Sequence, residues 1–156
     1  MITVILDGKE IMAKENSTIL QVARDNNVDI PTLCYLKDCM SLGKCGVCLV
    51  DANGKIIVAC ATKIKEGMVI DTKSEAVQER IKKRISSLLD THEFKCGPCP
   101  RREDCEFLKL VIKTKAKASK PFLPEDREQY IDSRSSALVL DRTKCILCGR
   151  CVAACK

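Results

Sequence analysis

Twelve cysteines and one histidine are the residues of this 156-residue chain whose side chains could do chemistry. Thiolates and imidazole nitrogens are ligands for zinc and iron, and an iron-sulfur cluster commonly takes four of them. The cysteines fall into three groups along the chain, and the histidine precedes the second group. Twelve cysteines plus one histidine make thirteen ligands, so three sites of four ligands leave one cysteine spare.

The first group contains the stretch GKCGVC, in which two residues separate Cys45 from Cys48. This spacing lets adjacent thiolates of one tight loop turn toward one iron. Gly43 and Gly46 allow the backbone to fold closely and to aim amide N–H groups at sulfur, which stabilises an anionic cluster. The stretch therefore predicts half of an iron-sulfur site.

A distant pair of cysteines must complete this first site. Cys60 lies at the end of an expected hairpin strand and is the natural fourth ligand. Either Cys34 or Cys39 can supply the remaining ligand. Spacing does not separate them, because Cys39-x5-Cys45-x2-Cys48 is one residue from the plant-type ferredoxin pattern.

The second group, HEFKCGPCPRREDC, contains His92, Cys96, Cys99 and Cys105. Only three cysteines lie near enough to fill four ligand positions, and the single histidine of the chain lies four positions before Cys96 at the end of an expected helix. A neutral imidazole in place of a thiolate lowers the negative charge of a cluster and changes its potential. The pattern predicts a site with one histidine and three cysteine ligands.

The third group, Cys145, Cys148, Cys151 and Cys155, has the spacing C-x2-C-x2-C-x3-C of the bacterial ferredoxin run. In two-cluster ferredoxins the fourth cysteine of such a run binds the other cluster. The chain ends one residue later at Lys156, where that family usually has proline. The run predicts a 4Fe-4S site and one ligand of a further site.

Disulfides and zinc are the alternatives for so many cysteines. The N-terminus MITVILDGKE does not have the pattern of a signal peptide, so an intracellular, cytoplasmic location is expected, where clustered cysteines are more often metal ligands than disulfides. A structural zinc module that docks partners stays open as a hypothesis, although zinc does not explain the third run. No apolar stretch is long enough to span a bilayer, so no membrane association is expected.

The net charge of +6 is concentrated in the middle third of the chain. The lysines there are interpreted as a solvated helix face in preference to a docking patch. A docking patch would suit an acidic redox partner better than nucleic acid, because aromatic residues are not interleaved with the basic ones. These lysines are Lys109, Lys113, Lys115, Lys117 and Lys120.

The elements that must position the first group form a small α+β unit. Alternating apolar residues at 2–6, a turn at Asp7-Gly8 and a second run near Ile11 predict a β-hairpin. A helix capped by Asn16 or Ser17 should follow, with an apolar stripe at 19–23 and an end at the Asn26-Asn27 break. After the cysteine loop, 47–51 and 56–60 predict a second hairpin around Asn53-Gly54, and 68–70 a further strand.

Two helices are expected around the second group. Thr72 with Glu75 resembles a capping box for a helix that reaches about Asp90. A further helix is predicted over 104–118, with Phe107, Leu108, Val111 and Ile112 on its buried side. Residues 125–136 are expected to be a loop, and residues 138–140 a short strand before the third group.

The three groups, with the connecting text HEFKCGPCPRREDCEFLKLVIKTKAKASKPFLPEDR and DRTKCILCGRCVAACK, resemble the N-terminal part of clostridial iron-only (FeFe) hydrogenases. Those ferredoxin-dependent enzymes make or consume dihydrogen. The resemblance implies an α+β fold: a β-grasp 2Fe-2S ferredoxin-like domain at 1–75, a small helical 4Fe-4S domain at 76–124, and the start of a bacterial-ferredoxin-like domain at 125–156. The first two units also resemble iron-sulfur subunits of NADH dehydrogenase and diaphorase-type complexes.

By this resemblance Cys39 is the spare cysteine, and the remaining cysteines and His92 divide into ligand sets. The sets are Cys34, Cys45, Cys48 and Cys60 for a 2Fe-2S cluster; His92, Cys96, Cys99 and Cys105 for a 4Fe-4S cluster; Cys145, Cys148 and Cys151 for another 4Fe-4S cluster; and Cys155 for a second, incomplete one.

The resemblance therefore implies an electron-transfer module without catalytic residues, as a fragment whose hydrogenase catalytic domain would lie downstream. A redox partner such as ferredoxin is expected, and the parent protein would be a ferredoxin hydrogenase. A fragment of an NADH dehydrogenase or diaphorase-type subunit is the alternative. We expect the first two clusters to form and the third to be absent, incomplete or labile.

Overall fold

The computed structural model describes residues 1–37 and 43–155 and divides into two compact units. The first unit is Met1–Ile81 together with the residues from Gly149 onward, and the second is Lys82–Cys148. The boundary between the units falls within helix α2 (Glu75–Leu89).

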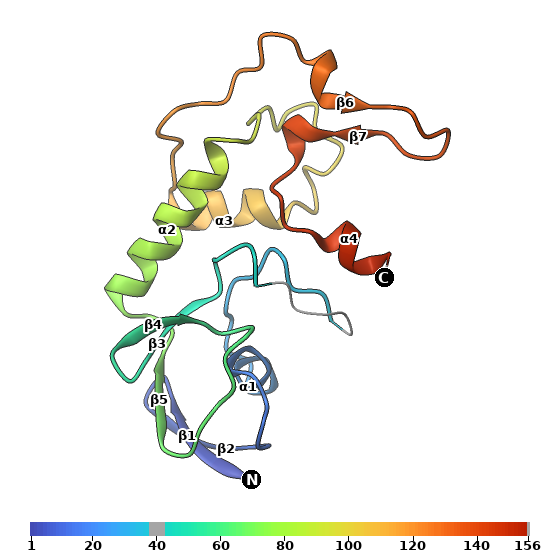
Figure 1. Ribbon diagram of the computed structural model, residues 1–156. Helices are drawn as coiled ribbons and strands as arrows, with labels where there is room; N and C mark the ends of the chain where they lie inside the picture. The colour runs from blue at the N-terminus through green and yellow to red at the C-terminus, as the bar shows by residue number, and fades with distance from the viewer. Residues whose placement is uncertain (38–42, 156) are drawn as a thin grey trace. The chain divides into compact units, whose positions relative to one another are not determined.

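A five-stranded mixed sheet forms the centre of the first unit, in the order β2-β1-β5-β3-β4 (Figure 1). Strand β1 pairs antiparallel with β2 and parallel with β5, while β3 pairs antiparallel with β4 and β5. Both expected hairpins are present. The strands are β1 (Ile2–Leu6), β2 (Lys9–Ala13), β3 (Leu49–Ala52), β4 (Lys55–Val58) and β5 (Met68–Asp71).

The two hairpins turn at Asp7-Gly8 and Asn53-Gly54, and all four residues have positive φ. Two consecutive positive φ values are what a type I′ turn requires, and its twist matches that of the strands. The Asp-Gly and Asn-Gly pairs therefore explain why the chain reverses at these positions.

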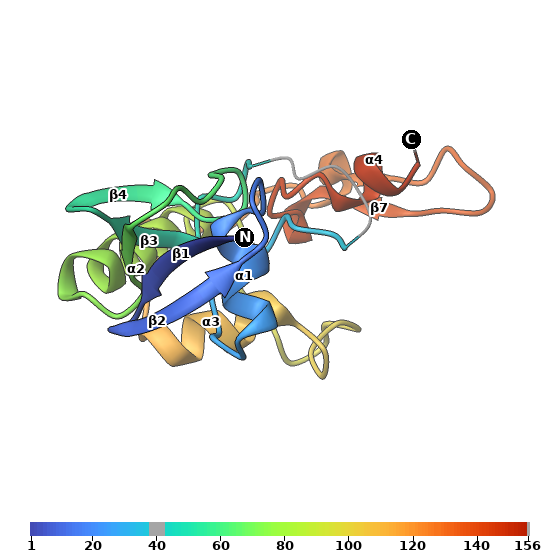
Figure 2. The same ribbon diagram turned by 90° about the horizontal axis from the view of Figure 1, so that it is seen from below.

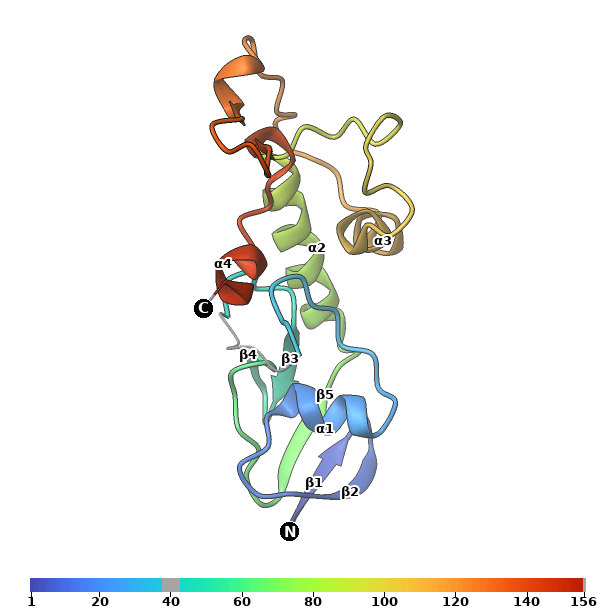
Figure 3. The ribbon, with the colours of Figure 1, turned by 90° about the vertical axis from the view of Figure 1, so that its right-hand side faces the viewer.

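The core of the first unit lies between the sheet and helix α1 (Ile19–Asp25), which covers one face of it (Figures 2 and 3). Val4 on β1 alternates with exposed or half-buried neighbours and is fully buried. It belongs to one apolar cluster with Ile19 and Leu20 of α1. Burial of this apolar surface is the main force that holds helix and sheet together.

Helix α1 is capped by Thr18 and not by the expected Asn16 or Ser17. The Thr18 hydroxyl accepts the Gln21 N–H at 3.2 Å, and the Gln21 side-chain oxygen accepts the Thr18 N–H at 2.8 Å. This reciprocal capping box satisfies amide groups that helical bonding leaves unpaired at a helix start.

Helix α2 also starts differently from the expectation of a capping box at Thr72 and Glu75. The N–H and hydroxyl of Thr72 both donate to the Asp7 carboxylate, each at 2.8 Å. The Ser74 hydroxyl instead accepts the Val77 N–H at the first turn. Thr72 therefore ties the end of β5 to the first hairpin.

The second unit contains helix α3 (Glu106–Thr114), which is shorter than the predicted 104–118. It ends at Lys115, whose left-handed conformation stops the helix. Phe107 and Val111 are buried as predicted, but Ile112 is 68% exposed. Ile112 lies about 100° further round the helix than Val111, outside the narrow buried face.

A two-stranded sheet in the second unit replaces parts of the expected loop and strand. Strand β6 (Ile131–Asp132) lies within the predicted loop 125–136 and pairs antiparallel with β7 (Leu140–Asp141). Leu138 and Val139, predicted to be strand residues, precede β7 and are exposed. Short helical segments complete the chain: η1 (Glu128–Tyr130), η2 (Arg142–Lys144) and α4 (Arg150–Ala154).

The capping box at Thr18 gives the first prediction. Replacing Thr18 by alanine should lower the free energy of unfolding by ~1 kcal/mol, because the Gln21 amide loses its acceptor. Urea unfolding of the anaerobically prepared chain, followed by circular dichroism, measures this change.

Ser17→Ala is the matched control, because Ser17 is the cap that the sequence suggested. It should leave the unfolding free energy unchanged within experimental error. Equal losses for the two variants would contradict the cap at Thr18.

Candidate metal centres

Four cysteines of the first group lie together in the interior of the first unit. Their side chains are almost fully buried, with relative exposures of 1–3%. The thiol of Cys34 contacts that of Cys45, and the thiol of Cys48 contacts that of Cys60. The structure thus places Cys34, from the segment after α1, beside the Cys-x-x-Cys loop. Cys39 lies outside the described residues.

Burial and crowding oppose ionisation of these thiols. The side-chain hydrogen bond between Cys48 and Cys60, and then burial, raise the pKa of Cys48, and burial is the main cause of a raised pKa at Cys45. Backbone hydrogen bonds from Val47 and Leu33 act in the opposite direction at Cys45. Positively charged iron would supply the stabilisation that buried thiolates lack, so this set fits an iron-sulfur cluster.

The backbone of the Cys-x-x-Cys loop shows why glycine is needed there. Gly46, between Cys45 and Cys48, has a φ of 64°, a left-handed conformation that side chains disfavour. This conformation accompanies the hydrogen bond that the Val47 backbone makes with Cys45. The sequence-based expectation of a tight, amide-lined loop is confirmed at this glycine.

The second group brings three half-buried thiols near one another in the second unit. Burial raises the pKa of Cys96, and the electrostatic interactions of Cys96 with Cys105 and Cys99 raise it further. Cys105 caps helix α3, and its Sγ accepts the Leu108 N–H at 3.3 Å. Hydrogen bonds from backbone N–H groups to sulfur are common at the cysteine ligands of iron-sulfur clusters.

His92 has the properties of an imidazole available for ligation. Its Nδ1 is buried and has no hydrogen-bond partner in the described part of the chain. Its ring packs edge to face on the ring of Phe107, with ring centroids 5.2 Å apart. Phe107 follows the candidate ligand Cys105 by two positions in the sequence. Burial, and then the charge of Lys144, lower the pKa of His92 and favour the neutral form that coordinates metals.

The third group is divided between the two units. Cys145 and Cys148 are half-buried at the end of the second unit, whereas Cys151 and Cys155 are exposed on and after α4, which belongs to the first. The Cys145 Sγ accepts the Leu147 N–H at 3.4 Å. The grouping of these four cysteines remains a prediction from their spacing.

No disulfide joins any cysteine in residues 1–37 and 43–155. Across the same residues, no three histidine, cysteine, aspartate or glutamate side chains are close enough to hold one metal ion. None of the helices described there combines the length and apolar character needed to cross a membrane.

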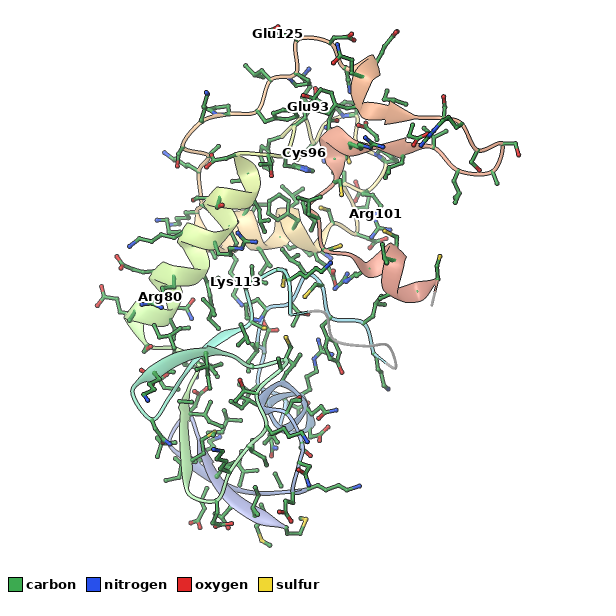
Figure 4. The ribbon with its side chains drawn as sticks, viewed as in Figure 1. Arg80, Glu93, Cys96, Arg101, Lys113 and Glu125 are labelled. Atoms are coloured by element: carbon green, nitrogen blue, oxygen red, sulfur yellow. The ribbon has the colours of Figure 1, made fainter. Side chains whose placement is uncertain are left out.

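Sequence reasoning missed Glu93, which follows His92 directly and is buried (Figure 4). The ammonium groups of Lys95 and Lys144 hold the pKa of this carboxyl down to about 2. A buried carboxylate has to be paired, so Glu93 indicates a polar network beside the second group. Its only signal in the sequence is its place next to a candidate ligand.

Three family models match successive parts of the chain. A 2Fe-2S iron-sulfur cluster binding domain matches residues 1–75. The iron hydrogenase 1-like, iron-sulfur centre-binding domain matches residues 76–116. A 4Fe-4S binding domain matches residues 138–156. All three cysteine groups therefore lie within matched iron-sulfur domains.

Longer curated proteins match almost the whole chain. Iron hydrogenase 1 from Clostridium pasteurianum is 59% identical over 99% of this chain, which spans 27% of that protein. The NAD-reducing hydrogenase HoxS subunit gamma from Cupriavidus necator is 31% identical over 97% of this chain, which spans 64% of that subunit.

A solved structure shares the fold. A chain in the crystal structure of an NAD+-reducing NiFe-hydrogenase in the H2-reduced state superposes with a TM-score of 0.88 at 32% identity. The match covers 98% of this chain and 65% of that chain. By sequence and fold, the chain is an iron-sulfur electron-transfer region that is homologous to the accessory-cluster region of iron hydrogenase.

Proposed function

We propose that this chain relays single electrons to or from the catalytic part of a ferredoxin-dependent iron hydrogenase that makes or consumes dihydrogen. The observation that carries this proposal is the set of four buried cysteines in the first unit, paired as Cys34 with Cys45 and Cys48 with Cys60. The 59% identity to an iron hydrogenase favours this parent over an NADH dehydrogenase or diaphorase-type complex.

The proposed ligand sets follow the three cysteine groups, within domains at residues 1–75, 76–124 and 125–156. Contacts among thiols support the first set, electrostatic interactions among thiols support the second, and domain similarity supports all three. The sets are Cys34, Cys45, Cys48 and Cys60 around a 2Fe-2S cluster; His92, Cys96, Cys99 and Cys105 around a 4Fe-4S cluster; Cys145, Cys148 and Cys151 around another; and Cys155 on a further 4Fe-4S cluster.

The chain's own residues bind these groups and adjust their potentials. An iron-sulfur cluster supplies iron that gains or loses one electron, with no bond made or broken in a substrate. Thiolate ligands provide negative charge, the imidazole of His92 provides none, and backbone N–H groups donate to ligand sulfur. Burial of the first set excludes water from its four sulfurs.

We propose ferredoxin as the external redox partner and the cytoplasm as the location. The five exposed lysines at 109, 113, 115, 117 and 120 give this part of the second unit a positive surface. Charge complementarity of this kind speeds the encounter with an acidic protein and weakens with salt.

Metal and sulfide analysis tests the relay itself. Anaerobically reconstituted protein should hold about six iron atoms and about six sulfide ions, two of each for the first cluster and four for the second. The third cluster should be absent, incomplete or labile, because its own set has only three cysteines. Electron paramagnetic resonance of the reduced protein should show one 2Fe-2S and one 4Fe-4S signal. A colourless protein that contains zinc would contradict the proposal.

Paired cysteine variants test the first ligand set. Cys34→Ser should remove most of the 2Fe-2S signal, because the thiol beside Cys45 is lost. Cys39→Ser is the matched control and should leave both signals intact. Loss of the 2Fe-2S signal in the Cys39 variant alone would show that Cys39, and not Cys34, is the ligand.

A histidine variant tests the second set. His92→Cys should lower the reduction potential of the 4Fe-4S signal by on the order of 100 mV, because a thiolate adds negative charge where the imidazole is neutral. The 2Fe-2S signal is the internal control and should not move. An unchanged redox titration would remove His92 from the ligand set.

A further inference from the structure

Glu93 is a buried acid that belongs to none of the ligand sets. Its side chain is 2% exposed, within the second unit. Removing a carboxylate from water is unfavourable unless charged and hydrogen-bonding partners surround it. The partners of Glu93 therefore show which parts of the chain its burial holds together.

Two of the four partners, Thr143 and Lys144, come from the segment that leads into the third cysteine group. The Glu93 N–H donates to the Thr143 carbonyl at 2.8 Å, and the Lys144 ammonium donates to the Glu93 carbonyl at 2.7 Å. Glu93 Oε2 accepts the Thr143 hydroxyl at 3.2 Å and lies 3.2 Å from Lys144 Nζ. Both the backbone and the carboxylate of Glu93 therefore bond to Thr143 and Lys144.

Two further cations complete the network around the carboxylate. Lys95 Nζ lies 2.9 Å from Glu93 Oε1, and Arg127 Nε lies 3.3 Å from Oε2. The Lys95 side chain is 65% exposed, whereas that of Lys144 is 21% exposed. Water screens the charge of Lys95 more strongly, so the charge of Lys144 interacts more strongly with the Glu93 carboxylate.

The positions of this pair in the sequence connect two ligand groups. Glu93 follows His92 directly, and Lys144 precedes Cys145 directly. The Lys144 ammonium also lies close enough to His92 and Cys96 to act on both electrostatically. A shift of either partner would therefore move a candidate ligand or change the charge beside one.

We propose that Glu93 and Lys144 form a charged clamp that positions the His92 loop against the segment entering the third cysteine group. Their opposite charges adjust the reduction potential of the 4Fe-4S cluster that His92 would bind. The inference rests on the proposed iron-sulfur function. Reduction adds one negative charge to a cluster, so a nearby cation favours the reduced state and a nearby anion disfavours it. Glu93 and Lys144 are positioning residues and not ligands.

Single neutralising variants of the full, anaerobically loaded chain test the clamp by redox titration with electron paramagnetic resonance. Lys144→Gln should lower the potential of the 4Fe-4S signal, and Glu93→Gln should raise it. Each change should reach about tenfold in the equilibrium constant for one-electron reduction, which is about 59 mV. Shifts of opposite sign are a result that loss of packing alone does not produce.

Matched variants separate the clamp from general charge effects. Lys144→Arg keeps the cation and should retain the original potential. Lys95→Gln removes an exposed partner of the same carboxylate and should give a smaller shift than Lys144→Gln. Glu125→Gln removes an exposed acid outside the network and should give none. Shifts of the same sign for Glu93→Gln and Lys144→Gln, or shifts no larger than that of Glu125→Gln, overturn the proposal.

Hydrogen exchange by mass spectrometry tests the same clamp without a cluster. In Glu93→Gln, amides at 92–95 and 143–146 should exchange faster, because the carboxylate no longer anchors Lys144. Unchanged exchange in this variant overturns the clamp even in protein that fails to load iron. Absence of iron and sulfide from the unmodified chain would instead contradict the relay, so the two failures are distinguishable.

Discussion

The burial of four thiols in one small unit is the constraint on which the rest of the first unit depends. Burial and contact with neighbouring thiols raise the pKa of Cys45 and of Cys48, so the interior favours thiolates only when positive charge is supplied. The chain has no tryptophan, three phenylalanines and two tyrosines to build a core. Metal binding at such a site also contributes folding free energy, because the unfolded chain does not hold the site.

Backbone amides reach a cysteine sulfur in each of the three groups, through three different local structures. At Cys45 the hydrogen bond comes from a loop with a left-handed glycine, at Cys105 from the first turn of α3, and at Cys145 from the Leu147 amide. Hydrogen bonds to sulfur are one means by which a protein adjusts cluster potential. The same chemical effect therefore arises without a common fold for the three groups.

The three groups also differ in how they are held. The sheet and α1 surround the first, whereas α3 and a buried ion network surround the second. The chain spans 27% of an iron hydrogenase and 64% of a subunit of an NAD-reducing hydrogenase. One electron-transfer region thus accompanies proteins with different names and lengths, which is expected if it passes electrons without acting on a substrate.

The sequence by itself determined the features that depend on neighbouring residues. Cysteine spacing indicated the ligand groups, Asp-Gly and Asn-Gly indicated both hairpins, and the apolar stripe at 19–23 indicated α1, because turns and helices follow from local backbone preferences. The resemblance to hydrogenases assigned Cys34 to the first set, where local spacing had left Cys39 equally possible.

Only the tertiary structure decided the contacts between distant segments. Thr72 bonds to Asp7 across 65 residues instead of capping α2, and Glu93 meets Thr143 across 50 residues. Ile112 is exposed because the neighbours of α3 cover only a narrow face of it. A polar side chain has several possible partners of similar energy, and the folded chain chooses among them by which segments it brings within hydrogen-bond distance.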